Sequence, residues 1–117
     1  MNDSILQNTS KEFAKSIILL CRKMKETGTE SALTSQLLRA GTSVGANIHE
    51  SKYAQGTKDF ISKLEIALKE CNESDYWIDL LFETKYILEE DYSILKKDII
   101  TLRRMLVSSV TKLKNKL

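Results

Sequence analysis

The chain has 117 residues, the size of a single domain built around one hydrophobic core. Hydrophobic residues make up 42% of it and charged residues 29%, proportions that are typical of folded proteins and exclude a disordered chain. The formal net charge of +2 is too small to indicate nucleic-acid binding by itself. Proline is absent and glycine occurs only four times, so long helices are expected.

The sequence carries no targeting signal that we can identify. The first ten residues are too polar for a signal peptide, and no apolar run approaches the roughly 18 residues that a membrane span requires. We therefore expect a cytoplasmic protein without a membrane-spanning segment. Cys21 and Cys71 both fall within predicted helices, and in that compartment we expect buried thiols rather than a disulfide.

The first predicted helix covers residues 4–27. Its seam alternates steps of four and three, the spacing typical of a helix that packs along a neighbouring helix. The seam residues are Leu6, Ser10, Phe13, Ile17, Leu20 and Met24. Gly28 follows as the expected C-terminal cap, because glycine adopts a positive φ without strain.

The second predicted helix covers residues 30–54 and contains Gly41 and Gly45, four positions apart on one face. Each interior glycine costs a helix about 1 kcal/mol relative to alanine, so two of them indicate a packing requirement. We expect a flat strip against which the following helix packs closely. A kinked or frayed helix is the alternative interpretation.

The third predicted helix covers residues 58–87, a rod of about 45 Å at the usual rise per residue. It keeps the four-three alternation throughout, with a seam of Phe60, Leu64, Ala67, Cys71, Ser74, Ile78 and Leu81. Four further apolar side chains lie off this seam and would not be needed by it. We predict that these four contact another subunit: Ile61, Leu68, Trp77 and Phe82.

The fourth predicted helix covers residues 90–115. It begins with three acids and ends with three lysines, the charges that suit the two ends of a helix dipole. Its seam is formed by Tyr92, Leu95, Ile99, Leu102, Leu106 and Leu113. The whole pattern predicts an all-α protein, an antiparallel up-down-up-down four-helix bundle, as one domain over residues 1–117.

Charge is unevenly spread along the two last helices. Residues 57–88 carry four bases and seven acids, whereas residues 89–117 carry seven bases and four acids. Three interpretations are open: pairing of the acidic third helix with basic helices, a basic face that contacts phosphate, or a simply solvated surface. The candidate nucleic-acid-binding residues are Lys96, Lys97, Arg103, Arg104, Lys112, Lys114 and Lys116.

No residue set in the chain has the spacing of an active site. The only histidine, His49, and the two cysteines do not show the spacing of a metal site. The glycines of GTSVG fall inside a helix and lack the Lys-Ser/Thr end of a phosphate-binding loop. We therefore predict no catalytic residue, no metal, no cofactor and no small-molecule substrate.

Polar residues recur along the second helix beside the glycines: Arg39, Ser43, Asn47 and Glu50. On the third helix, Glu70 and Glu73 offer the opposite charge to Arg39. We predict a polar ladder between these helices that fixes their register, as a single buried polar residue does in coiled coils.

The segments LLRAGTSVGANIHES (37–51) and DFISKLEIALKECNESDYWIDLL (59–81) resemble the family of proteins encoded within intervening sequences of bacterial 23S rRNA genes, also called the S23 ribosomal protein family. The resemblance implies a four-helix bundle that assembles as a homopentamer and whose cellular role is largely undefined. The residues that match the family pattern are Arg39, Gly41, Ser43, Gly45, Asn47, Glu50, Phe60, Leu64, Glu65, Ala67, Glu70, Glu73 and Trp77. The resemblance gives none of them a catalytic role.

A related branch of this family is the accessory protein of diversity-generating retroelements, which partners a reverse transcriptase and binds nucleic acid through a strongly basic surface. The present chain departs from that branch because it is nearly neutral. We therefore expect a non-enzymatic homo-oligomer, a pentamer by resemblance, that serves as an assembly or interaction module. The alternative is a nucleic-acid-binding accessory factor that uses a basic face of the first and fourth helices.

Overall fold

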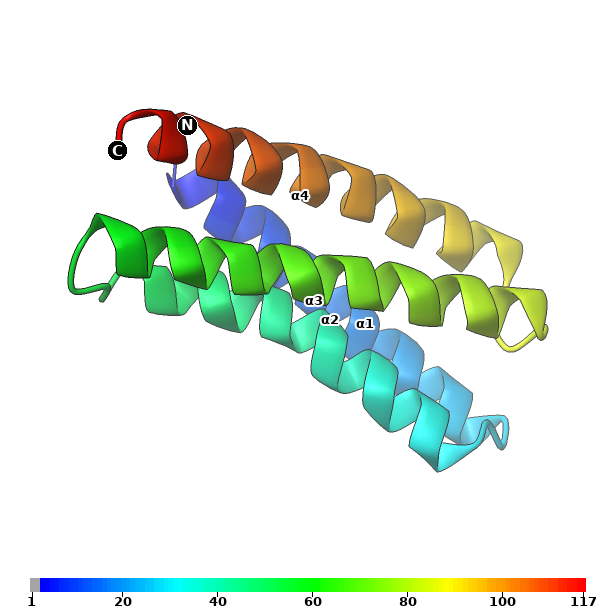
Figure 1. The fold of residues 1–117 in the computed structure, drawn as a ribbon. Coiled ribbons are helices and arrows are strands. Elements are labelled where there is room, and N and C mark those ends of the chain that lie inside the picture. The colour runs from blue at the N-terminus through cyan, green and yellow to red at the C-terminus, as the bar shows by residue number, and fades with distance from the viewer. Residues whose placement is uncertain (1–2) are drawn as a thin grey trace.

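The structure is a computed structural model that describes residues 3–117 as four consecutive helices (Figure 1). They are α1 (Asp3–Glu26), α2 (Ser31–Ser51), α3 (Thr57–Glu83) and α4 (Glu89–Asn115). Successive helices run in opposite directions and are joined by short turns, so the predicted up-down-up-down bundle is confirmed. The predicted ends are less accurate, because α2 ends three residues and α3 four residues earlier than expected.

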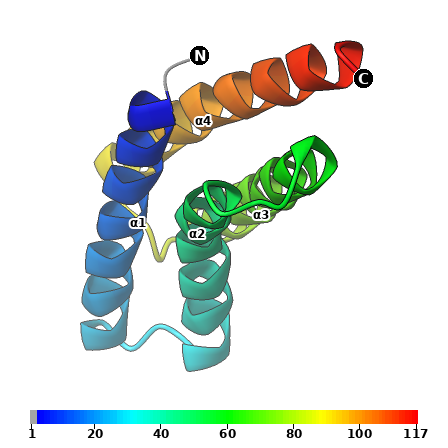
Figure 2. The same cartoon turned by 90° about the vertical axis from the view of Figure 1, so that its left-hand side faces the viewer.

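The helices pack as two hairpins, α1–α2 and α3–α4, which Figure 1 shows running obliquely to one another. Each helix contacts its two neighbours around the bundle, and the described parts of the diagonal pairs do not meet. The α1–α4 contact is the least extensive of the four neighbouring pairs. Figure 2 shows α1 and α2 standing side by side, with the C-terminal half of α4 directed away from α1. The molecule is an elongated rod of 48 × 22 × 20 Å.

The core follows the predicted seams. Large side chains from all four helices are fully buried in it, among them Phe13, Ile17, Leu37, Leu64, Ile78, Leu81, Ile99, Leu102 and Leu106. Ser10 and Ser74 are polar members of the seams and are also buried. Each hydroxyl donates a hydrogen bond to a carbonyl of its own helix, Gln7 O at 3.0 Å and Glu70 O at 2.8 Å. Because each hydroxyl group has a hydrogen-bond partner, serine can occupy these buried positions without leaving a polar group unpaired.

Two turns use the left-handed backbone conformation. Gly28 has φ of 84°, and the next amide, Thr29 N, donates to Met24 O at 2.9 Å, as expected for a C-terminal cap. Lys85 adopts φ of 70°, and Tyr86 N donates to Leu81 O at 2.9 Å. The second cap contains no glycine, and this is why sequence inspection extended α3 too far.

The glycines of α2 face α1, and the expected close packing against the following helix is wrong. A Cβ atom on Gly41 would lie 2.9 Å from both Cγ1 and Cγ2 of Ile17. A Cβ atom on Gly45 would lie 3.4 Å from Ser10 Oγ. The helix itself is continuous from Ser31 to Ser51, so the glycines do not mark a break. Gly41 instead lets the Ile17 side chain of α1 approach the backbone of α2.

Candidate functional site

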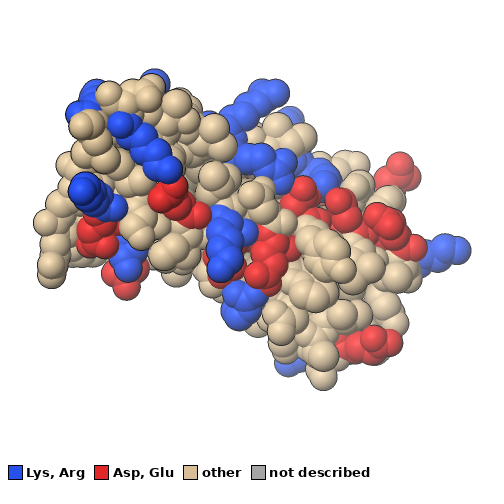
Figure 3. Space-filling view, viewed as in Figure 1, with Lys and Arg blue, Asp and Glu red and all other residues tan. Residues whose placement is uncertain are grey.

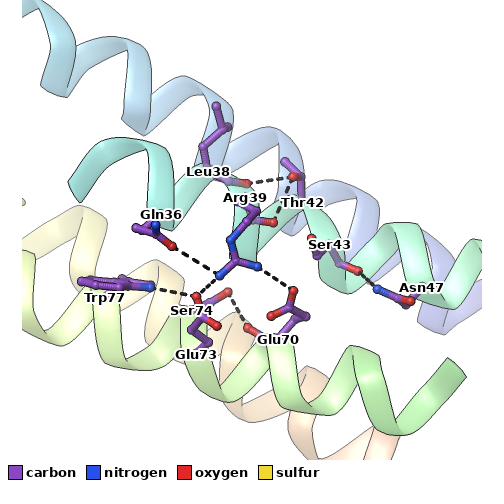
Figure 4. A network of polar contacts seen from close by, with 10 residues as sticks. All are labelled: Gln36, Leu38, Arg39, Thr42, Ser43, Asn47, Glu70, Glu73, Ser74 and Trp77. Atoms are coloured by element: carbon purple, nitrogen blue, oxygen red, sulfur yellow. Dashed lines mark hydrogen bonds and ion pairs between the residues drawn. The ribbon is translucent and has the colours of Figure 1, made fainter. Parts of the chain in front are cut away.

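The clearest polar cluster on the bundle links α2 to α3 through Arg39 (Figure 4). The guanidinium donates to Glu70 Oε2 at 2.9 Å and also pairs with Glu73. Glu73 accepts a second hydrogen bond, from Trp77 Nε1 at 3.1 Å. Arg39 is 48% exposed, whereas Glu70 is only 12% exposed. The predicted contact between Arg39 and these two carboxylates therefore exists, at the edge of the bundle.

The rest of the predicted ladder does not cross between helices. The Asn47 side chain donates to Ser43 O at 2.9 Å, within its own helix. Glu50 is exposed. Among the described residues, the predicted ladder is therefore confined to Arg39 and its two glutamates, and its role in fixing the register of α2 on α3 stays a prediction.

A second and larger polar cluster links α3 to α4. Lys96 pairs with Asp75 and donates to Asp79 Oδ1 at 3.0 Å. Arg103 donates to Asp75 Oδ2 at 2.8 Å and to Asn72 Oδ1 at 2.9 Å. The two acids of α3 thus each bind a base of α4, and the hairpin is held by charge along its length.

The ionisation of this cluster follows from its contacts. Burial raises the pKa of Asp75, but hydrogen bonds from Lys96 and Arg103 and their charges outweigh burial and hold the pKa below its ordinary value. Burial lowers the pKa of Lys96, but its bonds to Asp75 and Asp79 outweigh burial and raise it. Both groups are therefore fully charged at neutral pH.

Three of the seven candidate nucleic-acid-binding residues are occupied by these contacts with α3. Lys96 and Arg103 belong to the cluster just described, and Lys114 pairs with Glu65 at 2.7 Å. Figure 3 shows the consequence, with Lys and Arg side chains interspersed among Asp and Glu side chains on the face seen there. The exposed remainder, without an ion pair among the described residues, is Lys97, Arg104, Lys112 and Lys116. Of the three interpretations of the charge pattern, pairing between helices accounts for these three bases.

Two exposed apolar side chains lie together where α1 and α4 meet. Leu19 of α1 is 56% exposed and Ile94 of α4 is 57% exposed. They flank a groove of about 290 Å³ that has Leu20 and Leu95 among its lining residues. Asp98 follows Ile94 by one helical turn, and partial burial raises the pKa of its carboxyl. Asp98 is not among the lining residues, which also include Ser16 and the ion pair of Lys23 with Asp91. We call this groove the α1–α4 groove.

A second exposed set lies on the outer side of α4. Lys97, Ile100, Arg104 and Val107 follow one another at steps of three, four and three, so they form one stripe. All four side chains are exposed. We call this set the α4 stripe. We did not predict the α4 stripe from the sequence, although its residues have the same helical spacing as the buried seams.

Comparison with known proteins assigns the chain to a protein family. The family model of the 23S rRNA-intervening sequence protein matches residues 2–108. The chain belongs to this family. It is also similar to a crystal structure from Bacteroides thetaiotaomicron of a protein with unknown function from the S23 ribosomal protein family. The two share 41% identity with a TM-score of 0.91, over 95% of this chain and 99% of that one. No curated protein matches the chain.

The predicted subunit contacts of this family member need one correction. Ile61 is only 4% exposed and belongs to the core of its own chain, so it is not available to a second copy. The reason is that α3 packs between two neighbouring helices and buries a wider arc than a single seam. Leu68, Trp77 and Phe82 are partly buried and also pack against the chain's own core, and Phe82 stacks on Tyr92 with ring centroids 3.9 Å apart.

Among the described side chains, those of residues 5–117, no group of three or more His, Cys, Asp or Glu is placed to hold a metal ion. None of the described helices is long and apolar enough to cross a membrane. Cys21 and Cys71 are buried free thiols, and burial raises the pKa of each to about 11. A thiol with such a pKa is a poor nucleophile at neutral pH.

Proposed function

We propose that this member of the 23S rRNA-intervening sequence protein family is a non-enzymatic assembly module, a homo-oligomer whose copies meet through α1 and α4. The observation that carries the proposal is the exposure of Leu19 and Ile94 beside a groove at the least extensive contact of the bundle. Apolar side chains exposed together favour burial against another surface, since each Å² of apolar area removed from water contributes about 25 cal/mol.

The chain itself offers a complementary surface. The α4 stripe combines two apolar side chains, Ile100 and Val107, with two bases that have no ion pair among the described residues. The α1–α4 groove is lined by apolar side chains and by the ion pair of Lys23 with Asp91, and the partly desolvated carboxyl of Asp98 follows Ile94 by one helical turn. We infer that the stripe of one copy lies in the groove of the next, where Arg104 or Lys97 pairs with Asp98.

Such a contact joins two different surfaces, so it is head-to-tail. Each copy then has one surface of each kind left to bind a further copy, and a head-to-tail contact closes into a ring if the rotation between copies allows it. The homopentamer implied by the family resemblance is a ring of this type. The proposal therefore supports a cyclic assembly rather than a two-fold dimer.

The test compares variants by sedimentation velocity. We expect Leu19→Glu together with Ile94→Glu to reduce the assembly to single chains, because the new charges would be buried without partners. The control is Tyr76→Glu, at a side chain that is equally exposed but lies on α3. Wild-type protein that sediments as a single chain would contradict the proposed function. An assembly that survives the double substitution would contradict the proposed surface.

Mixing two variants tests the head-to-tail arrangement. Leu19→Glu with Ile94→Glu disables the groove and leaves the stripe, whereas Arg104→Glu disables the stripe and leaves the groove; all of these changes introduce negative charge, so the two altered surfaces repel each other. A head-to-tail contact predicts that neither variant alone forms a ring, and that a mixture forms mainly one-to-one pairs through the two intact surfaces. A mixture that behaves like its separate components would exclude this contact.

The alternative function, a nucleic-acid-binding accessory factor, is favoured by one observation: Lys97, Arg104, Lys112 and Lys116 are exposed and form no ion pair with a described residue. Binding through phosphates would be steeply salt-dependent, because each phosphate contact releases a counterion. The discriminating variant is Lys112→Gln with Lys116→Gln, which leaves the α4 stripe intact. A reduced salt slope for RNA or DNA binding in this variant would support the alternative, and weak binding that does not depend on salt would exclude it.

A further inference from the structure

A second groove lies on the opposite side of the molecule from α4, along the seam of α1 and α2. It has a volume of about 460 Å³ and is lined by Gln7, Asn8, Ser10, Lys11, Ala14, Thr42, Gly45, Ala46, His49 and Lys52. This volume is within the range of small-molecule sites. Neither the proposed assembly contact nor the bonds between α3 and α4 use any of these residues.

The floor of this groove is open because Gly45 carries no side chain. A Cβ atom at this position would meet Ser10 Oγ at 3.4 Å and Ser10 O at 3.5 Å, which is ordinary van der Waals contact. Close packing of the two helices therefore does not require glycine at Gly45, in contrast to Gly41. The small residues Ala14 and Ala46 also line the groove. An interior glycine costs a helix about 1 kcal/mol of stability. At Gly45 the structure associates this cost with an open groove and not with a tight helix contact.

The charge of the groove has one sign. Two lysines and the single histidine line it, and no Asp or Glu is among its lining residues. Within residues 5–117, neither Lys11 nor Lys52 forms an ion pair, in contrast to Lys96 and Lys114 on the far side of the bundle. Asn8 and Gln7 add amide groups that can donate hydrogen bonds. His49 is placed at the rim by its ring contact with Tyr53, at a centroid distance of 5.7 Å.

We propose that this groove binds a phosphoryl group, which Lys11 and Lys52 clamp from α1 and α2 while His49 lies at the rim. A dianionic phosphate monoester matches two positive charges and neighbouring amide donors better than an apolar ligand does. The phosphate can belong to a small phosphorylated metabolite or to the end of a polynucleotide strand. Both carry the same group, and the experiment separates them.

The experiment uses the full chain, labelled with ¹⁵N, and follows amide chemical shifts during titration with inorganic phosphate, with glycerol phosphate and with a 5′-phosphorylated oligothymidylate. We expect the perturbed amides to lie around the groove, at Ala14, Gly45 and Ala46. Lys11→Gln and Lys52→Gln should each weaken binding about tenfold, because a charge-assisted hydrogen bond contributes about 1.5 kcal/mol or more.

The matched control is Lys69→Gln, which removes one exposed charge of the same kind from α3 and should leave the affinity unchanged. If the oligonucleotide binds more tightly than glycerol phosphate, and both groove variants lose this difference, the phosphate belongs to a polynucleotide strand. If the two ligands bind with equal affinity, the phosphate belongs to a small ligand. Shifts spread over all lysines, or an affinity that Lys11→Gln and Lys52→Gln do not change, would overturn the proposal. So would the absence of any shift at millimolar phosphate.

Discussion

The two hairpins of the bundle have the same topology but are held together differently. In α1–α2 the contact is apolar and close, because Gly41 leaves room for Ile17, whose side chain would be 2.9 Å from any Cβ at that position. The α3–α4 contact has a polar edge, where Asp75 receives bonds from Lys96 and Arg103. The first hairpin therefore depends on the shape of its side chains, and the second depends in addition on their charge.

This difference separates two kinds of sensitivity. A contact between a glycine and a β-branched side chain does not depend on pH or salt, but it does not tolerate one extra methyl group. A contact between partly exposed charges tolerates changes of shape, and it weakens when a carboxylate is protonated or when salt screens the charges. Four predictions, in decreasing order of expected effect, test this contrast.

Gly41→Leu should have the largest effect. The new side chain would overlap Ile17, which is fully buried and stiff at its β-carbon, so we expect a loss of about 3 kcal/mol in the free energy of unfolding. Urea denaturation measures it. The control is Gly45→Ala, which meets only ordinary contacts and should be neutral or more stable by up to about 1 kcal/mol. Equal losses at both glycines would contradict the contrast between them.

Asp75→Ala should cost about 1 kcal/mol, since it removes the shared partner of Lys96 and Arg103 from a site where the acid is 21% exposed. A double-mutant cycle with Arg103→Ala measures the coupling directly. We expect the two single losses to add to more than the loss of the double variant. Additive losses would mean that the ion pair contributes nothing to the hairpin.

The same carboxylate predicts an acid-dependent loss of stability. The pKa of Asp75 is lower in the folded chain than its ordinary value of 3.8, so its contribution is fully present above about pH 4 and is lost as the pH falls through the folded pKa. We expect the wild type to lose more stability than Asp75→Asn between pH 5 and pH 2, by roughly the free energy of this one pair. Parallel curves for the two proteins would contradict the assignment.

The smallest effect is expected at Arg39. Its ion pairs with Glu70 and Glu73 lie at the edge of the bundle, and Arg39 is nearly half exposed, so the coupling should be about 0.2–1 kcal/mol. A double-mutant cycle between Arg39→Ala and Glu70→Ala measures it, and about 0.5 M sodium chloride should reduce it. A coupling that is unchanged by salt would show that the contact is not mainly electrostatic.

The helices and their buried faces could be predicted from the sequence because each seam repeats at the helical period. Phe13, Ile17 and Leu64 are buried as predicted. The direction of the glycine strip could not be predicted in the same way. Periodicity places Gly41 and Gly45 on one face of α2, but α2 has two neighbours, and the pattern does not say which of them that face meets.

The candidate surfaces were predicted less well than the fold. The contact of Arg39 with Glu70 and Glu73 was expected from opposite charges at matching positions, and the structure contains it. Ile61 was misplaced because a helix between two neighbours buries more than one seam. The α1–α4 groove was missed because Leu19 and Ile94 lie on different helices, and only the fold brings them together.

Native mass spectrometry of the full chain, purified with and without nuclease treatment, tests self-assembly most directly. We predict one discrete species whose mass is a multiple of the 13.4 kDa chain, unchanged by nuclease and reduced to single chains by Leu19→Glu with Ile94→Glu. A wild-type protein found only at 13.4 kDa at micromolar concentration, or an assembly that disappears when nucleic acid is digested, would contradict it.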